Sequence, residues 1–133
     1  MQIETEARGT VVVAEERAPV REYVRALLER ALPGVAQVSA TSSVDALEVL
    51  EALSAHACGP VVLVSGVHLC QVDELAEHVW GSSMPVSVVL LGGSDTPSDR
   101  ARARQLEATL IEGPDGFRRL AEVVAELLTP TLH

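Results

Sequence analysis

The residues best placed for chemistry are two adjacent glutamates, Glu15 and Glu16, which follow an apolar run at 11–14. Two carboxylates at the end of a buried strand need a counter-charge, a metal ion or open water, because burying an unpaired carboxylate costs several kcal/mol or forces it to protonate. The other apolar runs that can end at the same edge finish in glycine, at Gly66, Gly92 and Gly113. The glutamates are therefore expected to stand alone, as half of a reaction centre.

The composition excludes several kinds of chemistry and of partner. All ten basic residues are arginine, so no lysine is present to form a Schiff base, bind phosphate or act as a general base. The formal net charge of −9 at pH 7 argues against nucleic acid as a partner, because phosphate contacts require a clustered positive surface. The sequence has no apolar stretch of membrane-spanning length and no recognisable signal peptide, which predicts a cytoplasmic protein without membrane contact.

Hydrophobic periodicity predicts five strands that alternate with five helices. The expected strands are β-branched or apolar runs at 10–14, 35–40, 61–64, 85–91 and 109–111. The expected helices carry apolar residues at helical spacing within 18–32, 44–53, 72–79, 95–107 and 120–127. In the second helix the inward side chains are expected to be Val44, Leu47, Leu50 and Leu53, and Ser94 or Asp95 is expected to cap the fourth.

This alternation predicts an α/β fold, in which a parallel sheet carries helices on both faces and the crossovers are right-handed. One domain is expected at 10–128, with an N-terminal extension at 1–9 and a C-terminal tail at 129–133. In such sheets ligands bind at the carboxyl ends of the strands. The glutamate pair and the three strand-ending glycines fall at that edge.

Three stretches of the chain resemble the receiver domain of bacterial response regulators. VVVAEERAPVREYVRALLERA at 11–31 is similar to the family's first strand, acidic pair and first helix, and PVVLVSGVHLCQVDEL at 60–75 aligns without gaps to its third strand and following loop. LIEGPDGFRRLAEVVAELL at 110–128 looks like its fifth strand, conserved proline dipeptide and final helix. The resemblance covers nearly the whole chain and implies a doubly wound, flavodoxin-like sheet of five strands in the order 2-1-3-4-5.

The resemblance also implies which residues occupy the family's phosphorylation site. In the family an acidic pair holds Mg²⁺, an aspartate accepts phosphate, a hydroxyl ends the fourth strand and a lysine precedes a proline. The matching positions in this chain are Glu15 and Glu16 for the pair, Gly66 for the aspartate, Leu90 or Leu91 for the hydroxyl, Gly113 for the lysine and Pro114 for the proline.

Phosphoryl transfer at such a site needs a carboxylate nucleophile, a divalent cation and positive charge near the phosphate oxygens. Gly66 supplies no nucleophile and Gly113 no charge. Ser65 is one residue too early, because neighbouring residues of a strand point to opposite faces. The sequence therefore predicts a vestigial pocket open to water, no enzymatic activity and no cofactor.

Other candidate ligands are weaker. Glu15, Glu16 and His68 form a possible transition-metal set, although an exposed loop histidine is the simpler interpretation. Cys58 and Cys70 lack metal-ligand spacing and are expected to be reduced thiols, with a disulfide as the alternative. The segment 92–96 is interpreted as a turn and helix cap, with an anion-binding loop as the alternative.

Arginines gather near the end of the chain, where 94–119 is neutral while the remainder carries the net negative charge. In the receiver family this region, formed by the fourth helix, fifth strand and fifth helix, binds partners or dimerises. The predicted partner surface consists of Arg100, Arg102, Arg104, Phe117, Arg118 and Arg119, and a solvated surface with local ion pairs is the alternative.

The function predicted from the sequence is a pseudo-receiver, a protein–protein interaction module of bacterial signalling that works without phosphorylation. Its partner is an unidentified protein or a second copy of the chain. The alternative is a domain that senses a small molecule or metal through the vacated pocket.

Overall fold

The computed structural model describes residues 9–55, 59–81, 86–92 and 97–129. In these residues strands and helices alternate strictly, which confirms the predicted α/β class. Their bounds are β1 Thr10–Ala14, α1 Ala18–Ala31, β2 Ala36–Ala40, α2 Ser43–Ala55, β3 Val61–Gly66, α3 Val72–Trp80, β4 Val86–Gly92, α4 Pro97–Gln105, β5 Thr109–Glu112 and α5 Gly113–Leu128.

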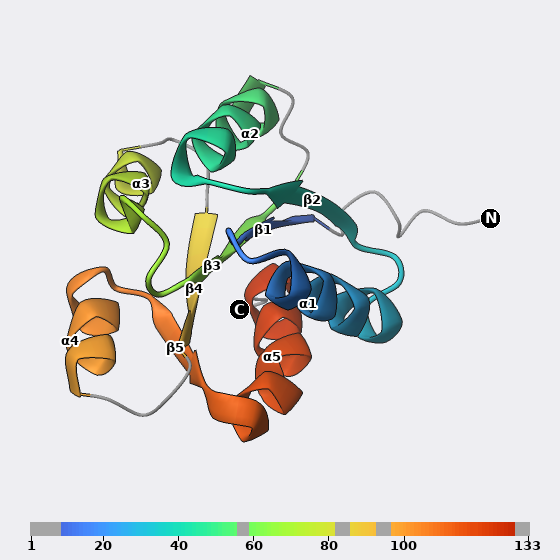
Figure 1. Ribbon diagram of the computed structural model, residues 1–133. Helices are drawn as coiled ribbons and strands as arrows, with labels where there is room; N and C mark the ends of the chain where they lie inside the picture. The colour runs from blue at the N-terminus through green and yellow to red at the C-terminus, as the bar shows by residue number, and fades with distance from the viewer. Residues whose placement is uncertain (1–8, 56–58, 82–85, 93–96, 130–133) are drawn as a thin grey trace, which may run out of the picture.

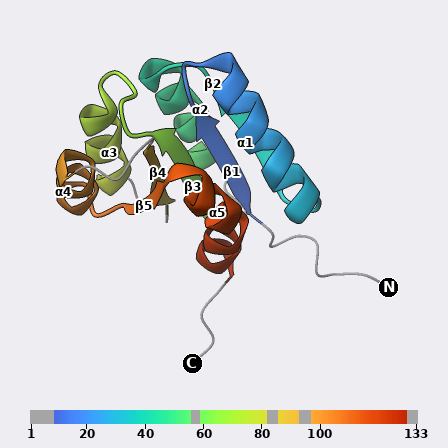
Figure 2. The same cartoon turned by 60° about the horizontal axis from the view of Figure 1, so that its bottom comes forward.

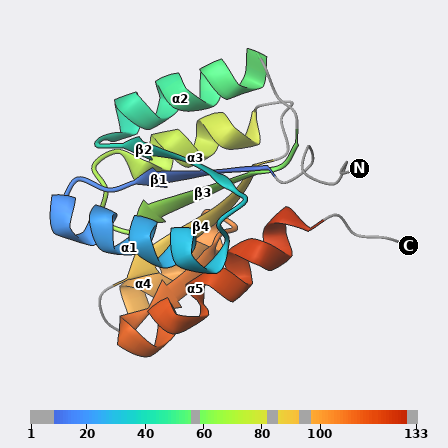
Figure 3. The same cartoon turned by 90° about the vertical axis from the view of Figure 1, so that its right-hand side faces the viewer.

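The strands form one parallel sheet in the order β2-β1-β3-β4-β5, as the resemblance implied. Figure 1 shows α2, α3 and α4 on one side of this sheet and α1 and α5 on the other. Turning the molecule brings α1 and α5 forward (Figure 2), and Figure 3 shows α2 and α3 lying side by side along the opposite face. The sheet is therefore covered on both faces, as parallel sheets generally are.

The core consists of two apolar layers, one on each face of the sheet. Side chains of successive strand residues point to opposite faces, so Leu63 and Leu90 belong to the layer under α2, α3 and α4, and Val64 and Leu91 to the layer under α1 and α5. All six residues of β3 are buried, which explains why this strand lacks the polar alternation of a half-exposed one. None of the described helices has the length and apolar character needed to cross a membrane.

The inward face of α2 differs from the prediction. Val44 is 59% exposed, whereas Ser43, Ala46 and Leu50 are buried. The Ser43 hydroxyl donates a hydrogen bond to the backbone carbonyl of Cys70, 2.5 Å away, and this contact draws the polar residue inward. The expectation for Val44 is thus wrong, while Leu50 is buried as predicted and Leu47 and Leu53 are partly buried against the core.

Candidate functional site

The carboxyl ends of the strands meet at one edge of the sheet. Ala14 pairs with Ser65, so Glu15 emerges from β1 beside Gly66. Gly66 in turn pairs with Leu91. The sequence left Leu90 and Leu91 open for the hydroxyl position of the fourth strand. The strand register favours Leu91 for this position, because Leu91 pairs with Gly66 and its side chain lies under α1 and α5. The Leu90 side chain lies on the other face of the sheet, under α2, α3 and α4.

Glu15 is buried, with 4% of its surface exposed, and Arg17 holds its carboxylate. The backbone N–H of Arg17 donates to Glu15 Oε2 at 2.9 Å, and the guanidinium donates from Nε to Oε2 at 3.0 Å and from Nη2 to Oε1 at 3.4 Å. Arg21 Nη1 donates to the Glu15 carbonyl oxygen at 2.7 Å. Both carboxylate oxygens are thus engaged from the turn that joins β1 to α1.

The expectation that the two glutamates stand alone in open water is wrong for Glu15. Only Glu16 is exposed. The hydrogen bond and charge of Glu15 raise the pKa of Arg17 above its ordinary value; partial desolvation opposes this shift and the charge of Glu16 adds to it. Arg17 directly follows the two glutamates in the sequence, so a counter-charge was available nearby. Its contact with Glu15 depends on the conformation of the turn between β1 and α1, which the sequence does not specify.

Gly66 is in close contact with the Glu15 carboxylate. A Cβ atom built on Gly66 would lie 2.5 Å from Glu15 Oε1, well inside van der Waals contact. Glycine is the residue that permits such an approach. The position expected to be a vacated pocket is therefore filled by the glutamate side chain, and that expectation is corrected.

Ser65, Gly113 and Pro114 complete the edge. Ser65 is fully buried, and its hydroxyl donates to the Gly66 carbonyl oxygen at 3.1 Å, so it is not presented to solvent as an acceptor. Helix α5 begins at Gly113 immediately after β5, with Pro114 in its first turn, where proline is favoured because the first helical N–H groups have no partner within the helix. The chain passes directly from strand to helix at the position of the family's lysine.

His68 lies close to a carboxylate of α4. Its Nε2 is 3.4 Å from Asp99 Oδ1, and Asp99 is buried in the first turn of α4. A Cβ on Gly92 would lie 3.2 Å from Asp99 Oδ2. In the described part of the chain, no group of three acidic, histidine or cysteine side chains is arranged to hold a metal ion, so the structure does not assemble Glu15, Glu16 and His68.

Asp99 was missed although its position carried a signal. It precedes Ala103 by one helical turn on α4 and Leu106, just beyond the end of that helix, by seven residues, and all three are buried. The expected caps, Ser94 and Asp95, lie outside the described residues, as does the possible anion-binding loop at 92–96 except for Gly92. Cys58 does as well, while Cys70 is an exposed free thiol.

The residues of the predicted partner surface do not all lie on one face of the protein. Arg100, Arg104, Arg118 and Arg119 are exposed on α4 and α5, which flank the edge strand β5. Arg102 instead forms an ion pair with Asp73 of α3. Phe117 points toward α1 and stacks on Tyr23, with ring centroids 6.0 Å apart and an interplanar angle of 29°.

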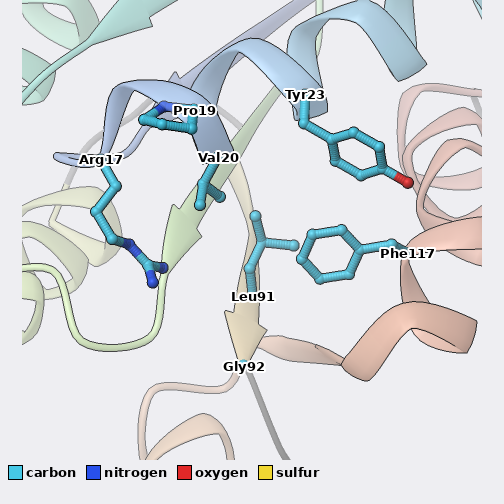
Figure 4. A pocket seen from close by; sticks show the side chains of 7 residues that line it. All are labelled: Arg17, Pro19, Val20, Tyr23, Leu91, Gly92 and Phe117. Atoms are coloured by element: carbon cyan, nitrogen blue, oxygen red, sulfur yellow. The ribbon is translucent and has the colours of Figure 1, made fainter.

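A cavity of about 320 Å³ opens between the N-terminal parts of α1 and α5, above the end of β4. Its lining consists of Arg17, Pro19, Val20, Tyr23, Leu91, Gly92 and Phe117. Figure 4 shows the Arg17 side chain on one side of Val20 and Leu91 and the two rings on the other. Sequence spacing does not predict this cavity, because its lining comes from elements that are distant in the chain.

Comparison with known proteins identifies the fold. No family model and no curated protein matches the sequence. Among solved structures, the signal receiver domain of the response regulator NarL from Mycobacterium tuberculosis is similar, with a TM-score of 0.72, 19% identity and coverage of 90% of this chain and 95% of that one.

Two further structures show the same likeness. Chemotaxis protein CheY4 of Vibrio cholerae matches with a TM-score of 0.67 and 18% identity over 92% of this chain and 100% of that one. The co-crystal structure of the Saccharomyces cerevisiae phosphotransfer protein Ypd1 with the receiver domain of Ssk1 contains a chain that matches with a TM-score of 0.73 and 14% identity, over 92% of this chain and 90% of that one. The chain therefore has the receiver fold.

Proposed function

We propose that this chain is a receiver-like signalling module that works without phosphorylation and acts through contacts with other protein chains. The observation that supports this proposal most directly is the Glu15 carboxylate lying against Gly66. An acceptor aspartate in a receiver would project its side chain from that position. Here an ion pair between Glu15 and Arg17 occupies the space instead.

The residues present do not suit Mg²⁺, the ion that the receiver fold implies. Mg²⁺ requires near-octahedral coordination by oxygen atoms, usually with one or two carboxylates and several waters. Both oxygens of Glu15 accept hydrogen bonds from Arg17, and Gly66 has no carboxylate to add. Only Glu16 offers an exposed carboxylate at the end of β1.

The same side chains argue against sensing at the former phosphorylation site. A ligand there would have to displace Glu15 from Arg17 and leave a buried carboxylate without its partner, which is strongly unfavourable. The sequence-based alternative of a sensor in the vacated pocket therefore finds no support at that position.

A role in protein contacts follows from the fold and from the exposed arginines. One of the similar structures is a complex between a receiver domain and a phosphotransfer protein, which gives a precedent for this fold as a binding partner. On this chain Arg100, Arg104, Arg118 and Arg119 are exposed around the edge strand β5. Arginine pairs with carboxylates in a bidentate geometry and is enriched in interfaces, so we assign the partner surface to α4, β5 and α5.

Charge reversal tests this assignment. We expect the triple variant Arg100→Glu, Arg104→Glu and Arg118→Glu to lose a partner captured in pull-down, or to lose dimerisation measured by light scattering. The single variant Arg104→Glu should weaken the same partner binding or dimerisation. Its matched control is Arg30→Glu, in the last turn of α1 and exposed, which should retain both. The proposal fails if the triple variant, folded by circular dichroism, keeps every partner and the same oligomeric state.

A further inference from the structure

We propose that the cavity between α1 and α5 binds a small, uncharged molecule that combines a planar apolar body with a hydrogen-bond acceptor such as an amide carbonyl. This cavity adjoins the former phosphorylation site, since Arg17 and Leu91 line it, but neither Glu15 nor Gly66 does. It also differs from the arginine surface around β5, so the two proposals are tested on different residues.

The aromatic wall is the first argument. The chain has one tyrosine, one phenylalanine and one tryptophan, and two of these three aromatic residues meet at the cavity. Tyr23 remains 55% exposed even though it stacks on Phe117. Aromatic faces favour a further ring in an offset-stacked or edge-to-face arrangement, so the exposed pair offers a preformed contact for a planar ligand.

The floor is the second argument. Pro19 and Val20 of α1 and Leu91 of β4 contribute apolar surface, and Gly92 contributes no side chain. The volume of 320 Å³ falls at the lower end of the range of about 300–1,000 Å³ typical of small-molecule sites.

Arg17 is the third argument, and it determines the charge of the ligand. Its Nε and Nη2 atoms bond to Glu15, whereas Nη1 has no hydrogen-bond partner among the described residues, and the side chain is 69% exposed. The guanidinium charge is already balanced by Glu15, with Glu16 also close enough to act on it. Arg17 remains charged, but it forms a neutral pair with Glu15, so its free N–H groups suit a neutral acceptor better than an anion.

The ligand class is tested by titrating the whole chain with three probes of the same size and shape. These probes are phenylacetamide, phenylacetate and phenethylammonium. Each titration is monitored by two-dimensional amide NMR. We expect phenylacetamide to shift the signals of Val20, Tyr23, Leu91 and Phe117 and to bind at least about fivefold more tightly than either charged probe. Absence of saturable shifts, or tightest binding by a charged probe, would overturn the inference.

Variants then test the location. Phe117→Ala should weaken phenylacetamide binding by about tenfold, and Val20→Phe, which fills the cavity rather than enlarging it, should also abolish most of the binding. Tyr23→Phe keeps the ring and should change the affinity less than about twofold. Val44→Ala, on the exposed side of α2, is the control. Unchanged affinity in both Phe117→Ala and Val20→Phe would contradict the assignment.

Discussion

At the scale of single residues, the carboxyl edge depends on the fit between Glu15 and Gly66. A buried carboxylate is tolerated here because Arg17 donates from its backbone and its guanidinium, and because Gly66 leaves the space that the carboxylate occupies. The three residues therefore act as one unit, and a change in one should alter the effect of a change in another.

A double-mutant cycle tests this coupling. Gly66→Ala should destabilise the fold by about 1–2 kcal/mol, because the new methyl group forces Glu15 away from Arg17. In a Glu15→Ala background the same substitution should cost close to nothing. The measurement is the free energy of unfolding from urea denaturation of the four proteins, and additive effects would show that Glu15 does not fill the space above Gly66.

The contribution of Arg17 is tested separately. Arg17→Ala should reduce stability by about 1–2 kcal/mol, less than for a fully buried pair because the arginine is 69% exposed. The stability of Arg17→Lys should fall between those of the unchanged protein and Arg17→Ala, since lysine keeps the charge but loses the planar, two-nitrogen contact. Arg119→Ala, exposed on α5, is the control in thermal and urea unfolding. An equal loss in both alanine variants would remove the special role of Arg17.

At the scale of elements, hydrophobic periodicity predicted where the strands and helices lie, but not the rotation of every helix. In α3 the expected apolar stripe is buried, at Val72, Leu75, Ala76 and Val79. In α2 and α4 polar residues enter the buried face, at Ser43 and Asp99. Apolar spacing placed Asp99 in line with Ala103 but could not show that a carboxylate would be buried there. The polar contacts of these residues lie elsewhere in the fold, at the Cys70 carbonyl for Ser43 and at His68 for Asp99.

The rotation of α2 gives a prediction for a pair of residues that the sequence treated alike. Leu50→Ala should cost about 2–4 kcal/mol, because Leu50 is buried and its loss leaves a cavity. Val44→Ala should cost about 0.5 kcal/mol or less, because Val44 is 59% exposed. Chemical denaturation of both variants measures the difference, and similar losses would contradict the observed orientation.

At the scale of the whole molecule, the alternation of elements predicted a covered parallel sheet, and the resemblance to receiver domains supplied the strand order. The site could be predicted only as a set of positions at one edge. The Glu15–Arg17 ion pair and the cavity beside Phe117 depend on side-chain directions and on packing between α1 and α5. Sequence spacing does not specify either of these.

Incubation of the whole chain with a small-molecule phosphodonor and Mg²⁺, followed by intact-mass spectrometry, tests the central claim most directly. A receiver domain that retains its acceptor aspartate, treated in the same way, shows that the donor is active. Because Gly66 provides no carboxylate and Glu15 is held by Arg17, we predict that the mass of this chain stays unchanged. A stoichiometric gain of one phosphoryl group would contradict the account.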